Sequence, residues 1–383
     1  MKLRVLADRT RAIHSLSFFT LVLVFVGCTT IRPVDPSLSS RLGDLLLVGF
    51  RGAEVEGNTE VSHLLCNLKV GGVILFERDT VTGTPRNITS PEQLARLTRD
   101  LQALARRCAG RPLLIAADSE GGAVMRLSPR VGYSPTFSPQ ELGEMGDLAL
   151  TELEARRIGR MLREAGINWN LAPVVDLALN PLNPVIVNHG RAFSADPERV
   201  TNHARAYLRG MRAAGLHTAL KHFPGHGSSR EDSHLGFVDV TDTANLELEL
   251  RPYRQLIAEG LVDSVMTAHV FNQNLDPDYP ATLSRATIHG LLRRALGFDG
   301  LVISDDLLMG AIGNQFGIEE AAALALGAGV DMLLISDTGP EQPPRAADRV
   351  MAAIKRALAE GQLKDSVVER ALARIERFRS QAH

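Results

Sequence analysis

Eight short apolar runs rich in β-forming residues recur along this chain of 383 residues, and segments with helical periodicity separate them. Alternation of this kind is typical of repeated β-α units, whose strands pair in parallel. No Gly-x-Gly-x-x-Gly follows the first run, so the pattern favours an α/β fold built as a single (β/α)8 barrel of the TIM type over an open doubly wound sheet. The expected strands are residues 45–50, 72–76, 113–117, 168–175, 216–221, 264–268, 301–304 and 332–335.

The segments between these runs are expected to be helices. Ser90-Pro91 and Asp196-Pro197 are residue pairs that begin helices, as an N-cap followed by proline in the first turn. The expected helices are residues 60–68, 91–108, 148–165, 197–214, 246–259, 284–296 and 318–328. Two more amphipathic segments, 350–358 and 366–378, are expected to cap the barrel, and no second domain is expected after the eighth strand.

The N-terminal residues have the layout of a secretory signal, in which four basic residues precede an uncharged run that ends at Gly27-Cys28. The run is shorter than the roughly 20 apolar residues that span a bilayer. Residues 25–28 resemble a bacterial lipobox, which implies lipidation of Cys28; an uncleaved anchor helix is the alternative. We expect a signal peptide at 1–27, a tether at 28–40 and the barrel with its C-terminal helices at 41–383.

These features predict an exported protein that is periplasmic or anchored to the outer membrane, and that meets a membrane only through an N-terminal lipid. The net charge of −2 and the absence of Lys/Arg blocks argue against a nucleic-acid partner. We expect a monomer. No spacing motif links Cys66 and Cys108, so two separate buried thiols are expected, although an oxidising compartment would let them pair.

Polar residues stand at five of the expected strand ends. In a TIM-type barrel the carboxyl ends of the strands meet at one face, where active sites form. The sequence therefore predicts one pocket at that face. The residues concerned are Asp118, Asp176, Lys221, His222, His269, Asp305 and Asp306.

The loop at 221–234 holds three histidines and is the richest of these strand ends. A metal site would use His222, His226 and His234 with Asp232. Pro224 and the glycine after it disfavour the helix on which a zinc-binding His-x-x-x-His pair lies, so neither a metal nor another cofactor is expected.

The second interpretation of the loop is acid/base catalysis. Asp232 would orient His234, whose imidazole can move a proton near neutral pH. A separate carboxylate is then needed, and Asp305 is the candidate nucleophile. Asp306 is its rival, but neighbours along a strand face opposite ways. Glycoside hydrolysis commonly uses one carboxylate nucleophile and one proton donor. A binding lipoprotein, which holds a ligand without turnover, is the third interpretation.

Six segments, in order along the chain, resemble family 3 glycoside hydrolases of the β-N-acetylglucosaminidase branch. Lys-His-Phe-Pro-Gly-His-Gly at 221–227 with Asp-Ser-His at 232–234 resembles the family signature. The other five are Asp-Ser-Glu-Gly-Gly-Ala-Val-Met-Arg at 118–126, Asn-Leu-Ala-Pro-Val-Val-Asp at 170–176, Arg-Ala-Phe-Ser at 191–194, Met-Thr-Ala-His at 266–269 and Ser-Asp-Asp-Leu at 304–307. The resemblance covers about residues 41 to 338.

The resemblance implies a retaining exo-β-N-acetylglucosaminidase that acts on peptidoglycan fragments or chitooligosaccharides. Asp305 would be the nucleophile and His234, paired with Asp232, the acid/base. In the family, the matching residues that hold the terminal sugar are Asp118, Arg126, Arg191, Lys221 and His222, and His269 lines the same site. A buried structural ion pair is the alternative for Asp118 and Arg126, and Asp176 is expected to be structural.

The chain departs from the family pattern at Ala123, where arginine is common, and at residues 188–190, which replace a shorter stretch. The export signal also departs from the cytosolic members. A phosphorylase and a β-glucosidase of the same family stay open as alternatives, as does a sugar-binding surface lipoprotein. The glycines and serines of the 221–234 loop are expected to pack little and to let the loop close over bound sugar.

Overall fold

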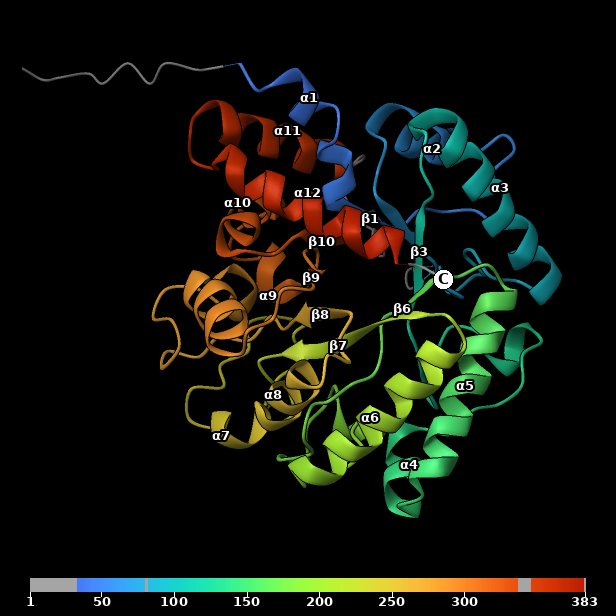
Figure 1. Cartoon of the computed structure of the whole chain (residues 1–383), viewed down its shortest axis with the longest axis vertical. Coiled ribbons are helices and arrows are strands. Elements are labelled where there is room, and N and C mark those ends of the chain that lie inside the picture. The colour runs from blue at the N-terminus through green and yellow to red at the C-terminus, as the bar shows by residue number, and fades with distance from the viewer. Residues whose placement is uncertain (1–32, 80–81, 337–345, 382–383) are drawn as a thin grey trace, which may run out of the picture. The chain divides into compact units, whose positions relative to one another are not determined.

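The computed structural model describes residues 33–79, 82–336 and 346–381, and its centre is a closed barrel of eight parallel strands (Figure 1). Around the barrel the strands follow the order β1-β10-β9-β8-β7-β6-β3-β2. The barrel confirms the predicted fold class, and each strand overlaps its expected run, with β7 and β9 ending two residues later than expected. The strands are β1 Leu46–Val48, β2 Gly72–Ile74, β3 Leu114–Ala117, β6 Trp169–Asn170, β7 His217–Phe223, β8 Ser264–Thr267, β9 Leu301–Asp306 and β10 Met332–Ile335.

Helices surround the barrel at all seven expected places (Figure 1). Ser90 and Asp196 cap α3 and α6 as expected, each side chain accepting a backbone N–H of the first turn. The expected helix at 246–259 is divided into α7 and α8, which meet at Leu250. The helices are α1 Pro36–Ser39, α2 Thr59–Ser62, α3 Pro91–Ala109, α4 Pro139–Met145, α5 Leu148–Glu164, α6 Pro197–Ala213, α7 Leu246–Glu249, α8 Arg251–Ala258, α9 Gly310–Gly313, α10 Ile318–Ala328, α11 Ala346–Ala359 and α12 Asp365–Ser380.

Shorter or wider helical turns complete the described part of the chain. Two are π-helices: η2 continues α2 through the expected helix at 60–68, and η6 lies in the expected helix at 284–296. The bounds of these turns are η1 Leu42–Leu45, η2 His63–Leu68, η3 Pro129–Val131, η4 Val187–His189, η5 Ala281–Leu283 and η6 Ala286–Ala295. Among the described residues, no helix combines the length and apolarity that crossing a bilayer requires.

A small hairpin after β3 was not predicted, and it helps to build the site. Its strands are β4 Ser119–Gly121 and β5 Val124–Met125, which pair antiparallel. Gly121 and Gly122 turn the chain with φ of 107° and 61°, a region that side chains rarely adopt. A Cβ on Gly121 would lie 2.2 Å from the Phe137 carbonyl oxygen. The two glycines therefore make a tight hairpin possible.

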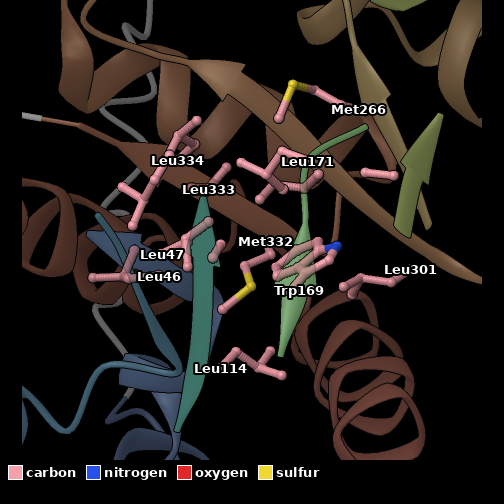
Figure 2. Close-up of a cluster of buried hydrophobic side chains, with 14 of the residues drawn as sticks. Leu46, Leu47, Leu114, Trp169, Leu171, Met266, Leu301, Met332, Leu333 and Leu334 are labelled. Carbon is pink, nitrogen blue, oxygen red and sulfur yellow. The ribbon is translucent and has the colours of Figure 1, made fainter. Parts of the chain in front are cut away.

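The interior of the barrel is packed with aliphatic side chains around Trp169 (Figure 2). The indole Nε1 donates to Ser264 Oγ at 3.2 Å, which satisfies its only polar group. Phe378 of α12 packs edge-on against the Trp169 ring at 4.9 Å and stacks on His217 at 4.1 Å. Trp169 and His217 begin β6 and β7, so α12 covers the amino-terminal end of these strands. This confirms the cap expected of residues 366–378, whereas α11 packs against α10 and η1.

Residues 36–39, which the sequence assigns to the end of the tether, pack with the barrel unit. The signal peptide at 1–27 and Cys28 lie outside the described residues, as does the first part of the tether. Asp35 caps α1 by accepting the Ser37 N–H at 2.7 Å, and Leu38 is buried in the main apolar core. Burial of Leu38 stabilises the packing of α1 on this unit.

The expectation of two separate thiols was wrong, because Cys66 and Cys108 form a disulfide. Cys66 lies near the end of η2 and Cys108 near the end of α3, and these helices pack against each other. Their Cα atoms are 4.8 Å apart although 42 positions separate them in sequence. Sequence spacing contains no information about this contact, since the packing of η2 on α3 creates it.

We expect the double variant Cys66→Ser/Cys108→Ser to lose about 2–4 kcal/mol of stability, because the cross-link restricts the unfolded chain. Chemical denaturation and thermal melting measure the loss. Reductant should lower the melting temperature of the wild type to that of the double variant and leave the variant unchanged. A wild-type melting temperature that does not respond to reductant would contradict the prediction.

Candidate active site

A cavity of about 700 Å³ opens where the carboxyl ends of the strands meet, as the sequence predicts. Loops after β2, β3, β7, β9 and β10 contribute to its wall, together with the β4–β5 hairpin. Eight of the nine predicted site residues line it. These eight are Asp118, Arg126, Arg191, Lys221, His222, Asp232, His234 and Asp305.

A network of buried charges forms one wall of the cavity. Lys221 Nζ lies 2.9 Å from Asp118 Oδ1 and 2.7 Å from Glu120 Oε1. Arg191 donates two hydrogen bonds of 2.8 Å to the two oxygens of Glu120. Burial opposes the ionisation of Glu120, but Arg191 and Lys221 hold the pKa of its carboxyl well below the ordinary value. Each buried charge thus has its counter-charge within hydrogen-bond distance.

Glu120 is a pocket residue that sequence reasoning missed. It stands two positions after Asp118 in the same motif, and β4 directs its fully buried carboxylate toward Arg191 and Lys221. The signal available in the sequence was the motif itself, in which an acid follows Asp118 just before two glycines. Strand-end reasoning overlooked it because the hairpin was not predicted.

Asp118 and Arg126 form the ion pair that was the structural alternative, and both also line the cavity. Arg126 Nη2 lies 3.3 Å from Asp118 Oδ2, and the guanidinium stands 5.4 Å above the centre of the Phe76 ring. Burial opposes ionisation of Asp118, yet Lys221 and Arg126 keep its pKa below the ordinary value. The pair is therefore both a structural link and a charged part of the pocket wall.

His222 is held in one orientation from both sides of its ring. Nδ1 lies 2.7 Å from Asp176 Oδ2, and Nε2 lies 3.3 Å from Arg191 Nη2. A guanidinium can only donate, so Nε2 accepts and Nδ1 donates to the carboxylate. Asp176 also accepts the backbone N–H of His226 at 2.8 Å. These contacts agree with the structural role expected for Asp176, which is buried and does not line the cavity.

The middle of the 221–234 loop is packed, contrary to expectation. Residues 221–229 are all buried. His226 lies between Ser229 Oγ at 2.8 Å and Ser233 Oγ at 3.0 Å, and burial lowers its pKa to about 4. A Cβ on Gly227 would lie 1.7 Å from the Leu177 carbonyl oxygen, so this glycine allows the loop to approach its neighbour. The small side chains of this loop therefore allow it to pack closely against its neighbours and do not make it flexible.

The histidines that a metal site would use are already engaged by other side chains. His222 is engaged by Asp176 and Arg191, and His226 by two serines. Within residues 33–79, 82–336 and 346–381, no group of three His, Cys, Asp or Glu side chains is arranged to hold a metal ion.

Asp232 and His234 form the predicted pair at the outer end of the loop. One carboxylate oxygen of Asp232 lies 2.7 Å from His234 Nδ1 and accepts the His234 backbone N–H at 2.8 Å. The carbonyl of His234 accepts the Gly310 N–H at 3.2 Å, which ties the pair to the start of α9. The His234 side chain is 60% exposed, so its outer nitrogen is accessible from the cavity that it lines.

Asp305 and Asp306 end β9 with opposite surroundings. Asp306 accepts hydrogen bonds from the backbone N–H groups of Leu308 and Ser336 and from the Ser336 hydroxyl, and burial raises its pKa to about 6. Burial also opposes ionisation of Asp305, but the surrounding imidazoles, His269 foremost, keep its pKa below the ordinary value. Both residues line the cavity, but Asp305 is the ionised carboxylate of the two, while Asp306 is engaged by hydrogen bonds from the protein.

His269 is the predicted site residue that the structure does not bring to the cavity lining. It is buried, and its ring nitrogens lie 2.8 Å from Thr282 Oγ1 and 2.9 Å from the Asp306 carbonyl oxygen. With both nitrogens engaged, the ring supports the Asp305–Asp306 segment and cannot also donate to a ligand.

Comparisons with known proteins find relatives that match most of this chain. A β-hexosaminidase from Alkalilimnicola ehrlichii is 39% identical over 307 residues, which are 78% of this chain and 82% of that protein. The β-hexosaminidase LpqI from Mycobacterium tuberculosis is 36% identical over 353 residues, 90% of this chain and 83% of that protein.

A solved glycoside hydrolase family 3 β-N-acetylglucosaminidase from Paenibacillus superposes with a TM-score of 0.82 at 36% identity. The match covers 91% of this chain, which spans 63% of that larger chain. The model of the glycosyl hydrolase family 3 N terminal domain matches residues 37–378, nearly the whole described barrel. The resemblance carried by the six motifs is thereby confirmed, and the chain belongs to glycosyl hydrolase family 3.

Proposed function

We propose that this chain is a retaining exo-β-N-acetylglucosaminidase that removes terminal, non-reducing N-acetylglucosamine. The observation that carries the proposal is one cavity lined by an ionised Asp305 and by the His234–Asp232 pair. Glycosidases of the retaining kind need one carboxylate nucleophile and one separate proton donor. The β-hexosaminidase names of the relatives support the same choice of sugar.

The reaction has two steps. Asp305 attacks the anomeric carbon and forms a covalent glycosyl ester, while the protonated His234 gives its proton to the leaving oxygen. His234 then takes a proton from water, which attacks the anomeric carbon and releases the sugar and the free carboxylate. Asp232 holds His234 through Nδ1, so that Nε2 is the atom that exchanges the proton.

The charged wall of the cavity is suited to sugar hydroxyls. Arg126, Arg191 and Lys221 can only donate, whereas the Asp118 carboxylate can only accept. His222 is held beside them by Asp176. Because most of these groups already pair with one another, they are in place before a sugar binds and need little reordering.

The natural substrate class in this proposal is a peptidoglycan fragment or a chitooligosaccharide, handled by a monomer. We also propose export to the periplasm or an outer-membrane anchor through Cys28, which lies outside the described residues. The disulfide between Cys66 and Cys108 supports an oxidising compartment.

Exchanging the carboxylate of Asp305 for an amide should abolish turnover, since an amide cannot form the glycosyl ester. We expect Asp305→Asn to lower kcat on a chromogenic N-acetylglucosaminide by at least about 10³-fold. Asp306→Asn is the matched neighbour and should keep kcat within about tenfold. Full activity of Asp305→Asn would remove Asp305 as the nucleophile. Binding without turnover by the wild type would favour the sugar-binding lipoprotein instead.

Removing the proton donor should act mainly on poor leaving groups. We expect His234→Ala to lower kcat on a disaccharide by about 10²–10⁴-fold, with a smaller loss on an aryl glycoside whose phenol leaves without help. Asp232→Asn should lie between the wild type and His234→Ala. Equal losses on both substrates would argue against proton donation by His234.

The acid limb of the pH profile follows from Asp305. Its lowered pKa predicts that the nucleophile stays ionised until the pH falls below its ordinary value of 3.8. We therefore expect the kcat/KM of folded enzyme to fall on this account only below about pH 4. Initial rates from pH 3 to 6, with circular dichroism to verify folding, measure it. An acid limb centred above pH 5 in folded protein would contradict the assignment.

A phosphorylase is the second candidate, because an imidazole does not repel an incoming anion as a carboxylate does. Its product in phosphate buffer would be N-acetylglucosamine-1-phosphate. We expect free N-acetylglucosamine at a rate independent of phosphate, measured by chromatography of the products. A parallel assay with an aryl glucoside tests the β-glucosidase alternative.

A further inference from the structure

Glu249, the last residue of α7, is a buried acid that the proposed reaction does not use. It is 2% exposed and lies beneath the loop that follows β7. One carboxyl oxygen accepts the Asn245 N–H at 2.8 Å, and the other has no hydrogen-bond partner among the described residues. A buried carboxylate with one donor is poorly stabilised as an anion.

The carboxyl of Glu249 is pressed against the turn at residues 224–229. A Cβ on Gly225 would lie 2.6 Å from the unpartnered oxygen of Glu249, so any side chain there would displace the Glu249 carboxyl. Ser228 lies beside the carboxyl, and its buried hydroxyl likewise has no partner within hydrogen-bond distance among the described residues. Tyr253, one helical turn after Glu249, packs edge-on against Phe223 at 5.1 Å. Glu249 therefore contacts the segment that joins the two functional ends of the loop.

Asp176 and Glu249 are neighbouring buried acids whose pKa values are shifted in opposite directions. Three N–H groups of His222 and His226 surround the Asp176 carboxylate and keep its pKa below the ordinary value despite burial. Burial and the charge of Asp176 raise the pKa of Glu249 to about 7. Tyr253 is the other titratable group that faces Glu249, and burial raises the pKa of its phenol well above 10.0. Among the described residues, no lysine or arginine forms an ion pair with Glu249.

We propose that Glu249 is a positioning residue whose protonated carboxyl holds the 224–229 turn against α7 and thereby keeps His222 and the Asp232–His234 pair in place. This inference rests on the proposed function, because its purpose is the geometry of that reaction. The turn is the link: its His226 bonds to Ser233, directly between the two members of the acid/base pair. Loss of the Glu249 proton places a second negative charge beside Asp176 and weakens the contact between α7 and the 224–229 turn.

The effect on folding has a definite sign. A carboxyl whose pKa is raised in the folded state favours folding at low pH, and this advantage is lost as the pH rises from the unfolded pKa near 4.5 through about 7. Glutamine imitates the protonated acid in shape and cannot ionise. Glu249→Gln should therefore gain stability relative to the wild type as the pH rises through this window.

The test compares wild type, Glu249→Gln and Glu249→Ala with a chromogenic N-acetylglucosaminide from pH 5 to 8.5. We expect the ratio of kcat for Glu249→Gln over wild type to be about 1 at pH 5 and to rise at least threefold by pH 8.5. Glu249→Ala should lower kcat at least tenfold at every pH with a smaller change in KM. Titration of the acid/base pair is common to wild type and Glu249→Gln and cancels in their ratio. Glu247→Gln, an exposed neighbour on α7, is the matched control and should give a flat ratio.

Hydrogen exchange of the peptide spanning residues 223–235 gives a readout that does not depend on activity. Its protection should fall between pH 6 and 8.5 in the wild type, after correction for intrinsic exchange, and stay constant in Glu249→Gln. A kcat ratio and a protection that do not vary with pH, or a Glu249→Gln variant as impaired as Glu249→Ala at pH 5, would overturn the proposal. Absence of turnover in the wild type itself would instead contradict the proposed function.

Discussion

The buried carboxylate of Glu120 is the constraint on which the site depends. A charge excluded from water is tolerated only with counter-charges and hydrogen bonds close by, and Glu120 receives these from Arg191 and Lys221. The three residues come from the β4–β5 hairpin, the loop before α6 and the end of β7, so one network joins three distant parts of the chain. Through Lys221 the network also includes Asp118. Because these charges are paired with one another across three segments, the loops at the barrel end form a rigid pocket wall.

Residues of the same type acquire different roles from their immediate hydrogen bonds. Asp305 and Asp306 are adjacent, yet Asp306 is bound by Ser336 and backbone amides while Asp305 keeps a carboxylate toward the cavity. The histidines divide in the same way: His226 is enclosed between serines, whereas His234 is exposed and held on one side only. A proton carrier needs an accessible nitrogen and a structural histidine needs none, so surroundings distinguish what residue type does not.

The barrel and most of its site were predictable from the sequence. The periodicity of apolar residues indicates the strands and helices, and the position of polar residues at strand ends indicates the site. Apolar runs of strand length alternate with helical periodicity, and parallel strands bring their carboxyl ends to one face. The failures have local causes. The hairpin that the two glycines after Glu120 form was not predicted. The glycines of the 221–234 loop were expected to pack little, although Gly227 permits close packing. His269 stands at a strand end, as a site residue would, but its ring turns to Thr282 and the Asp306 carbonyl.

By itself the sequence determined the fold class, the family and which strand ends carry polar residues. It also identified Asp305, Asp232 and His234 as the catalytic candidates. These follow from patterns between near neighbours, which the chain carries wherever it folds. Only the tertiary structure decided that Cys66 reaches Cys108, that Glu120 neutralises Arg191, and that Glu249 lies beneath the loop beside Asp176. Each of these depends on contact between segments 42 or more positions apart, or on burial. Long-range contact and burial arise only when helices and loops pack against a closed barrel.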